Sequence, residues 1–256
     1  MHRGHLCLAI ALGACGGGQQ PADRPPVISA VPTTRVVVED AHEEGPEDGV
    51  EFASTRGHME IAVIEAGIAP HKQALSDCYT TNLKKRRWLG GTVIIHWDIA
   101  KDGTVTAVRL GETEPGTNLG NWQIEKCILD VARAATFGKP VGGDADFQIP
   151  LEFTAKGKLV SWDADQTLRA VGGQTAKLDA CAKPKGRGVK ERIDAPKGEV
   201  WITVYVGPNG KAQSVGFAGK ATIADAWADC AEKAALAWRL PDPRGTVAKL
   251  SVAYAR

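Results

Sequence analysis

Two alternating hydrophobic segments, each followed by a turn signal, constrain the fold of this chain most strongly. Residues 91–99 (GTVIIHWDI) lead into Asp102-Gly103, and residues 199–206 (EVWITVYV) lead into Asn209-Gly210. Asp-Gly and Asn-Gly between such segments predict β-hairpins, because both residues of the turn adopt positive φ. The alternation also predicts that every second side chain of each strand faces a hydrophobic core.

The residues around the two hairpins predict the same order of elements twice: helix, strand, strand, helix and strand. The expected ranges are helices 70–86 and 121–135 with strands 91–99, 105–110 and 147–153, and then helices 165–182 and 223–238 with strands 199–206, 212–217 and 247–254. This pattern indicates an α+β fold in which helices pack on small antiparallel sheets. We therefore expect two tandem domains, residues 58–157 and 158–256, of which the second is a diverged copy of the first.

Four cysteines support this duplication. Cys78 and Cys127 are 49 residues apart, as are Cys181 and Cys230, and each pair falls on two predicted helices of one domain. The equal spacing is partly coincidence, because a longer stretch before the second hairpin turn offsets a shorter one after it. Redox-active cysteines usually occur as Cys-x-x-Cys, which is absent. An even number of cysteines in an exported chain therefore favours two structural disulfides, one within each domain.

The first residues, MHRGHLCLAIALGAC, are typical of a bacterial lipoprotein signal peptide. Arg3 gives a positive start, and the apolar stretch 6–12 is too short to span a bilayer. Leu12-Gly13-Ala14-Cys15 resembles a lipobox, whose cysteine thiol accepts the lipid; an ordinary leader or a misassigned start codon is the alternative. Gly16, in place of aspartate, resembles the pattern sorted to the outer membrane. We expect residues 1–14 to be removed and Cys15 to anchor the chain there, facing the periplasm.

Residues 15–57 predict an acidic tether between this anchor and the domains. Residues 16–57 contain eight acidic side chains against three arginines, together with many glycines and prolines. Such a segment cannot bury enough apolar surface to offset the entropy lost on ordering it. We therefore expect it to be disordered.

Several short motifs of the first domain follow the order of a known family. They are Ser76-Asp77-Cys78-Tyr79, Gly91-Thr92-Val93, Ile99–Val105, Lys126-Cys127-Ile128, Phe137–Pro140 and Ile149–Phe153. On these motifs, residues 59–154 resemble the AgmX/PglI C-terminal domain of myxobacterial envelope and gliding-motility proteins, which is similar to the TonB C-terminal fold. The resemblance implies a TonB-C-like topology and no catalytic motif. Residues 160–256 match only as a degenerate copy, with Ala182 in place of the tyrosine.

His96-Trp97-Asp98 is the sequence feature that most suggests catalysis or metal binding. On an alternating strand, His96 and Asp98 share the solvent-facing side while Trp97 points inward, and polar pairs on such a face are common. The matching positions of the second domain hold Thr203 and Tyr205, and the other histidines lack metal-site spacing. No nucleophile, phosphate-loop or dinucleotide motif occurs. We expect no enzyme activity, no cofactor and no metal.

Basic residues gather at two places. Lys84–Arg87 ends a predicted helix, where positive charge complements the helix dipole. The stretch 182–198 contains the candidate binding residues Lys183, Lys185, Arg187 and Lys190. It is either a solvated loop or a site for an anionic partner, such as a cell-wall polymer, lipopolysaccharide or the acidic tether. Nucleic acid is not expected in that compartment.

The last strand of each domain is a candidate docking edge, because an exposed strand can pair with a partner strand. Pro150 interrupts the donors of strand 147–153, whereas Ser251, at the position aligned with it, leaves strand 247–254 intact. The sequence thus predicts an outer-membrane lipoprotein that binds or scaffolds an envelope protein or polymer in a motility or transport assembly. A purely structural lipoprotein without a ligand is the alternative, and an enzyme of unknown class is a distant third.

Overall fold

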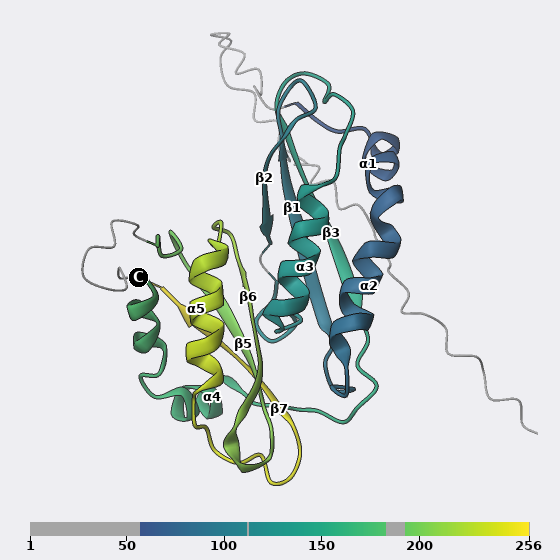
Figure 1. Ribbon diagram of the computed structural model, residues 1–256. Helices are drawn as coiled ribbons and strands as arrows, with labels where there is room; N and C mark the ends of the chain where they lie inside the picture. Colours follow the sequence, from purple (N-terminus) through teal and green to yellow (C-terminus); the bar gives the residue numbers. More distant parts are fainter. Residues whose placement is uncertain (1–56, 112, 183–192, 256) are drawn as a thin grey trace, which may run out of the picture.

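The computed structural model describes residues 57–111, 113–182 and 193–255, which form two α+β units lying side by side (Figure 1). The first unit, residues 57–157, contains α1 (Ile61–Ile68), a 3-10 turn (Ala69–His71), α2 (Lys72–Leu83), β1 (Gly91–Ile99), β2 (Val105–Leu110), α3 (Trp122–Arg133) and β3 (Ala145–Phe153). The second unit, residues 158–255, contains β4 (Val160–Ser161), α4 (Ala164–Val171), the 3-10 helix η2 (Thr175–Ala182), β5 (Val200–Val206), the 3-10 turn η3 (Pro208–Gly210), β6 (Ala212–Gly219), α5 (Asp225–Leu236) and β7 (Ala248–Tyr254).

The two sheets have the same connectivity. Their strand orders are β2-β1-β3 and β4-β7-β5-β6, so the first strand of each hairpin is central and the last long strand pairs with its other side. These pairings are antiparallel, and only the two-residue β4 runs parallel to its neighbour. The α+β class, the small antiparallel sheets and the repeated order of elements are therefore present as predicted.

Each sheet buries one face against helices. In β1, Val93, Ile95 and Trp97 are almost completely buried while the intervening residues are not. The indole Nε1–H of Trp97 donates to the carbonyl of Ala132 in α3 at 3.0 Å, which satisfies the one polar atom of that buried side chain. The inward position predicted for Trp97 is confirmed.

The first predicted helix of each unit differs from the observed one. The helix predicted at 70–86 is shorter and ends at Leu83, and α1, which was not predicted, precedes it. Helix 165–182 is divided into α4 and η2. Asp163 begins α4 with a capping box, and Gly172, at φ 30°, ends it in the left-handed conformation.

The two hairpin turns also differ. Asn209 and Gly210 have φ values of 65° and 67°, as predicted for a turn in which both residues adopt positive φ. In the first hairpin only Gly103 has positive φ, at 93°. Asp102 instead accepts a hydrogen bond from the Thr104 N–H at 2.9 Å, which holds the turn without the left-handed conformation.

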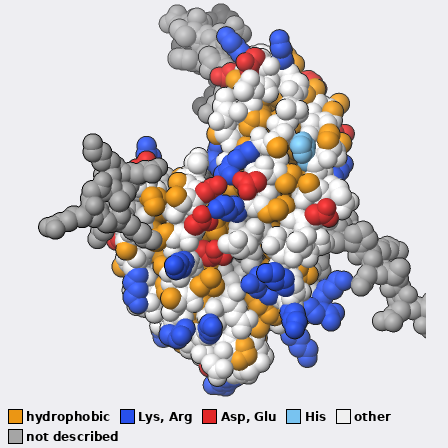
Figure 2. Space-filling model, viewed as in Figure 1, with side chains coloured by type: hydrophobic (Ala, Val, Ile, Leu, Met, Phe, Trp, Pro, Cys, Tyr) orange, Lys and Arg blue, Asp and Glu red, His pale blue; other side chains and the backbone are white. Residues whose placement is uncertain are grey.

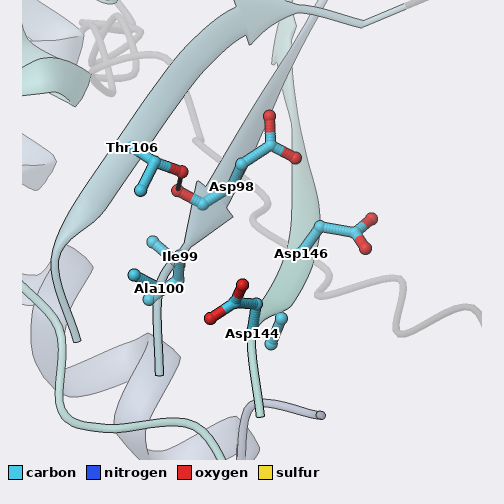
Figure 3. A pocket seen from close by; sticks show the side chains of 7 residues that line it. Asp98, Ile99, Ala100, Thr106, Asp144 and Asp146 are labelled. Atoms are coloured by element: carbon cyan, nitrogen blue, oxygen red, sulfur yellow. Dashed lines mark hydrogen bonds between the residues drawn. The ribbon is translucent and has the colours of Figure 1, made fainter. Parts of the chain in front are cut away.

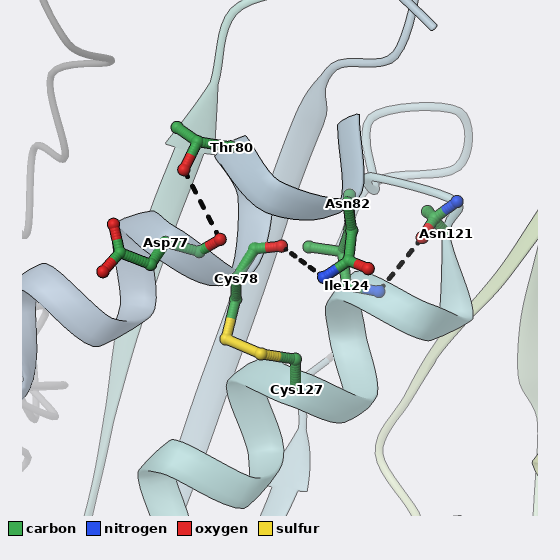
Figure 4. The surroundings of a disulfide bond; sticks show 7 residues. All are labelled: Asp77, Cys78, Thr80, Asn82, Asn121, Ile124 and Cys127. Atoms are coloured by element: carbon green, nitrogen blue, oxygen red, sulfur yellow. Dashed lines mark hydrogen bonds between the residues drawn. A yellow bond between two sulfur atoms is a disulfide. The ribbon is translucent and has the colours of Figure 1, made fainter. Parts of the chain in front are cut away.

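One disulfide lies within each unit, at the pairs expected from the sequence. Cys78–Cys127 joins α2 to α3 (Figure 4), and Cys181–Cys230 joins η2 to α5. The Cα atoms of each pair are 5.6 Å apart, within the range of ordinary disulfides. Each bridge closes a loop of 49 residues, for which the chain-entropy model gives a stabilisation of about 4 kcal/mol.

Candidate binding surfaces

A buried carboxylate connects the two units. Glu125, on the first turn of α3, accepts hydrogen bonds from the main-chain N–H groups of Gly120 and Asn121, both at 3.0 Å, and of Phe217 in β6 at 2.8 Å. Burial raises the pKa of Glu125 to about 8, although the three N–H donors oppose this shift. Because Phe217 donates from the outer edge of β6, the first unit covers that edge.

Charged side chains continue this interface along the outside. Asp229 of α5 accepts a hydrogen bond from Trp122 Nε1 at 2.7 Å and forms an ion pair with Lys126 at 2.8 Å. Arg133 and Asp225 form a second ion pair at 2.9 Å. Figure 2 shows acidic and basic side chains alternating where α3 and α5 meet. The units are therefore joined by both buried and exposed polar contacts.

The face of the second sheet that points away from α5 is covered by the first unit. Thr203 hydrogen-bonds to Asn118, and the Tyr205 hydroxyl donates to the Gly90 carbonyl at 2.7 Å. Lys249 is also buried there, with Nζ 3.2 Å from the same carbonyl and 5.4 Å from the centre of the Tyr205 ring. Burial lowers the pKa of Lys249 to about 8. This sheet face is thus a docking surface within the molecule itself.

The side chain of Ser251 lies in this interface, whereas its predicted role concerns the main-chain groups on the edge of β7. Its Oγ lies 2.5 Å from Thr203 Oγ1 and 3.5 Å from Asn118 Oδ1, so its side chain contributes to contact between the units. The predicted alignment of Ser251 with Pro150 is wrong. Ser251 pairs with Thr203, the counterpart of His96, whereas Pro150 pairs with Ile94. The residue that corresponds to Ser251 in the first unit is therefore the partner of His96, Gln148.

The predicted docking edge on β7 is also shorter than expected. The carbonyls of Val247 and Lys249 accept hydrogen bonds from Val160 and Trp162, so β4 and the residues after it cover the start of this edge. Because backbone groups alternate in direction along a strand, the groups that point outward beyond this point belong to Ser251 and Ala253. With only these two residues free on the edge of β7, a partner strand could form few main-chain hydrogen bonds there.

Within the described residues, the corresponding face of the first sheet is partly exposed and no second unit covers it. His96 Nε2 lies 3.3 Å from carboxylate oxygens of both Asp98 and Asp146, and Asp98 also pairs with Arg109. Burial lowers the pKa of His96, and Arg109 adds to this effect, while the two aspartates oppose it. His96 and Asp98 lie on the same face, as predicted from the alternation of β1. Arg109 and Asp146, which were not predicted, reach this face from β2 and β3.

An open hollow of about 320 Å³ lies at the end of this face. Asp98, Asp144 and Asp146 line it together with Thr106, whose hydroxyl donates to the Asp98 carbonyl at 3.0 Å (Figure 3). Asp144 already accepts a hydrogen bond from the Lys101 N–H at 2.8 Å. Within the described residues, no group of three or more histidine, cysteine or acidic side chains is arranged to hold a metal ion.

A basic patch lies at the end of α2. Lys84, Lys85, Arg86 and Arg87 follow the helix, and Lys156 and Lys158 stand beside them, because the N–H groups of residues 156 and 157 both donate to the Arg87 carbonyl at 2.8 Å. Figure 2 shows blue side chains gathered in this region, on the side of the first unit where α2 ends. We call these six residues the basic patch.

The candidate binding residues Lys183, Lys185, Arg187 and Lys190 lie outside the described residues, as does Cys15. Among the residues that the structure describes, no helix has the length and hydrophobicity needed to cross a membrane. Searches of protein-family models, curated proteins and solved structures find no match to this chain. Its function must therefore be inferred from these surfaces.

Proposed function

We propose that this chain is an outer-membrane lipoprotein anchored through Cys15, whose two units act together as a non-catalytic binding module of an envelope assembly. The lipobox-like residues Leu12–Cys15 and the acidic residues 16–57 support the anchor and the tether. The resemblance of residues 59–154 to the AgmX/PglI C-terminal domain supports a place in an envelope or motility assembly.

The observation that carries the binding proposal is the contrast between the two sheets. The second sheet uses the face opposite α5 to hold the first unit through Thr203, Tyr205 and Lys249. The first sheet has the same connectivity and leaves the equivalent face open among the described residues. The second sheet thus already binds a protein surface, that of the first unit. By analogy, we infer that the equivalent face of the first sheet binds the surface of a partner protein.

The chemistry of the open face favours a folded protein partner over strand addition. His96, Asp98 and Gln148 are partly exposed on it, and Ile94 and Pro150 add apolar surface. The outer edge of β3 is a poor docking strand because Pro150 has no N–H to donate. We infer that the partner contacts side chains of the face, with polar contacts fixing its orientation. The basic residues Lys183, Lys185, Arg187 and Lys190 remain a candidate site for steering an anionic partner.

Affinity capture from an envelope extract tests this proposal. The full chain carrying Cys15→Ser serves as bait, with Gln148→Lys as the test variant on the open face and Glu65→Lys as a matched control on exposed α1. We expect one set of proteins to be recovered by the parent and the control and lost with Gln148→Lys. Recovery of the same set by all three baits would place the binding surface elsewhere. Recovery of nothing would favour a purely structural lipoprotein.

A further inference from the structure

The basic patch concentrates positive charge from two separate segments. Residues 84–90 (KKRRWLG) and 154–158 (TAKGK) contain six basic side chains and no acid. Their backbones are held together by the two hydrogen bonds to the Arg87 carbonyl, and a Cβ on Gly157 would lie 2.9 Å from the Trp88 nitrogen. This close approach fixes the lysines of the second segment beside those of the first.

Four of the six basic side chains of the patch have no ion-pair partner within the described part of the chain. No ion pair there involves Lys84, Lys85, Arg87 or Lys158, and all four of these residues are exposed. Arg86 interacts electrostatically with Glu232 of α5. Like charges held this close repel one another, so an anionic occupant would stabilise the arrangement.

We propose that the acidic segment 39–51 of the same chain occupies the basic patch. This segment (EDAHEEGPEDGVE) contains seven acidic side chains and neither lysine nor arginine. It is the most acidic stretch of the sequence, and its charge is opposite to that of the patch. The contact shields the patch and holds the tether against the first unit.

The chain outside the structure is long enough for this contact. The described chain begins at Gly57, which is fixed at the β3 start by a 2.8 Å hydrogen bond to the Asp144 carbonyl. The patch lies at the other end of α1 and α2, which run one after the other along the first unit (Figure 1). These 23 residues, Ile61–Leu83, span about 35 Å at 1.5 Å per residue. About ten extended residues cover that distance, so the part of the segment that reaches the patch is 39–47, with five of the seven acids, while residues 48–56 cross the distance from Gly57.

An occupant attached to the same chain has an advantage over a free anion. A short connection gives an effective concentration in the millimolar range, which an external polymer or lipid headgroup must exceed to displace the segment. The contact is electrostatic and exposed, so salt should weaken it strongly. An anionic membrane surface is the competing occupant, and the experiment separates the two.

Zero-length carbodiimide crosslinking tests the contact, because it joins carboxylates only to amines that touch them. The full chain with Cys15→Ser is crosslinked at high dilution and mapped by mass spectrometry. We expect residues 39–51 to be joined to Lys84, Lys85, Lys156 and Lys158 in preference to the exposed control lysines Lys72, Lys101, Lys139 and Lys211. The preference should fall several-fold at 0.5 M salt, where exposed charges are screened. Crosslinks spread evenly over all eight lysines would refute the proposal.

Vesicle binding provides the second measurement. Replacing all acids of segment 39–51 by their amides should increase binding of the chain to phosphatidylglycerol vesicles several-fold, because the patch is then uncovered. Reversing Lys84, Lys85, Arg87 and Lys158 to glutamate should abolish that gain, whereas reversing the four control lysines should leave it. If the amide variant binds vesicles no better than the parent, the segment does not cover the patch.

Discussion

The main-chain N–H of Phe217 donates a hydrogen bond of 2.8 Å to the Glu125 carboxylate, which joins the edge of β6 to the first helical turn of α3. The carboxyl group of one unit thus takes the place of a neighbouring strand in the other. An unpaired sheet edge invites association with other chains. This contact removes one such edge and fixes the two units relative to each other.

Glu125 should make stability depend on pH. Its folded pKa of about 8 exceeds the usual 4.5, so the folded state holds a proton that the unfolded state releases. The resulting stabilisation is complete below pH 4.5. As the pH rises to about 8, the free energy of unfolding therefore falls by a few kcal/mol. Glu125→Gln should remove this dependence. It should also destabilise the fold by roughly 1–3 kcal/mol at pH 5, because its amide opposes the Phe217 N–H. Urea unfolding from pH 4.5 to 9 measures both effects, and equal pH slopes in the two proteins would contradict the assignment.

Gly216 of β6 should tolerate no side chain, because the units approach closely there. An added Cβ would lie 2.2 Å from Glu125 Oε1 and 2.3 Å from the Asn121 nitrogen. Gly216→Ala should therefore cost about 1–3 kcal/mol of unfolding free energy and expose the connection between the units to protease. Gly138→Ala is the control, because its Cβ would meet only the two methyl groups of the Val63 side chain, at 3.0 and 3.9 Å. Equal stability of both variants would show that the interface is not packed as described.

Much of the fold could be predicted from local pattern. Alternation and turn residues identified the long strands, since these features depend on neighbours in sequence. The interface could not be predicted in this way. Thr203 and Lys249 follow the pattern of a solvent-facing strand side, and only contacts with Asn118 and Gly90 of the other unit bury them. The role of Glu125 likewise depends on Phe217, which is 92 residues away.

Ser251 and Pro150 stand at the same distance from the ends of their predicted strands, but they pair at different places in the central strand. Ser251 pairs with Thr203, the counterpart of His96, whereas Pro150 pairs with Ile94, and this pairing cannot be read from the sequence of one strand. The sequence places only four residues of the basic patch together, Lys84–Arg87 at the end of a predicted helix. Lys156 and Lys158 join it only through the backbone contact with Arg87, which has no signal in the sequence.

In the proposed function, the membrane anchor depends on one group, the thiol of Cys15. Cys15→Ser should move the protein from the membrane fraction to the soluble envelope fraction and should abolish incorporation of radiolabelled palmitate. Cys7→Ser, within the apolar stretch, is the matched control and should change neither. Unchanged fractionation of the Cys15→Ser protein would show that another feature holds it at the membrane.

The basic residues of 183–190 should affect the rate of association more than the final affinity. Replacing Lys183, Lys185, Arg187 and Lys190 with glutamine should slow binding of an acidic partner, because exposed charges steer an encounter at long range. The difference should shrink above 0.1 M salt, where the Debye length falls below about 10 Å. Surface plasmon resonance with the captured partner measures this. A loss of affinity that persists at high salt would instead indicate direct contact.

Photo-crosslinking of the lipid-anchored chain in living cells tests the central claim most directly. A photoreactive amino acid at position 148 stands on the open face of the first sheet, and one at position 65 stands on exposed α1 as the control. We expect a discrete crosslinked species of higher mass from position 148 alone, in the membrane fraction. The absence of any species from position 148, or the same species from both positions, would contradict a binding module that uses this face.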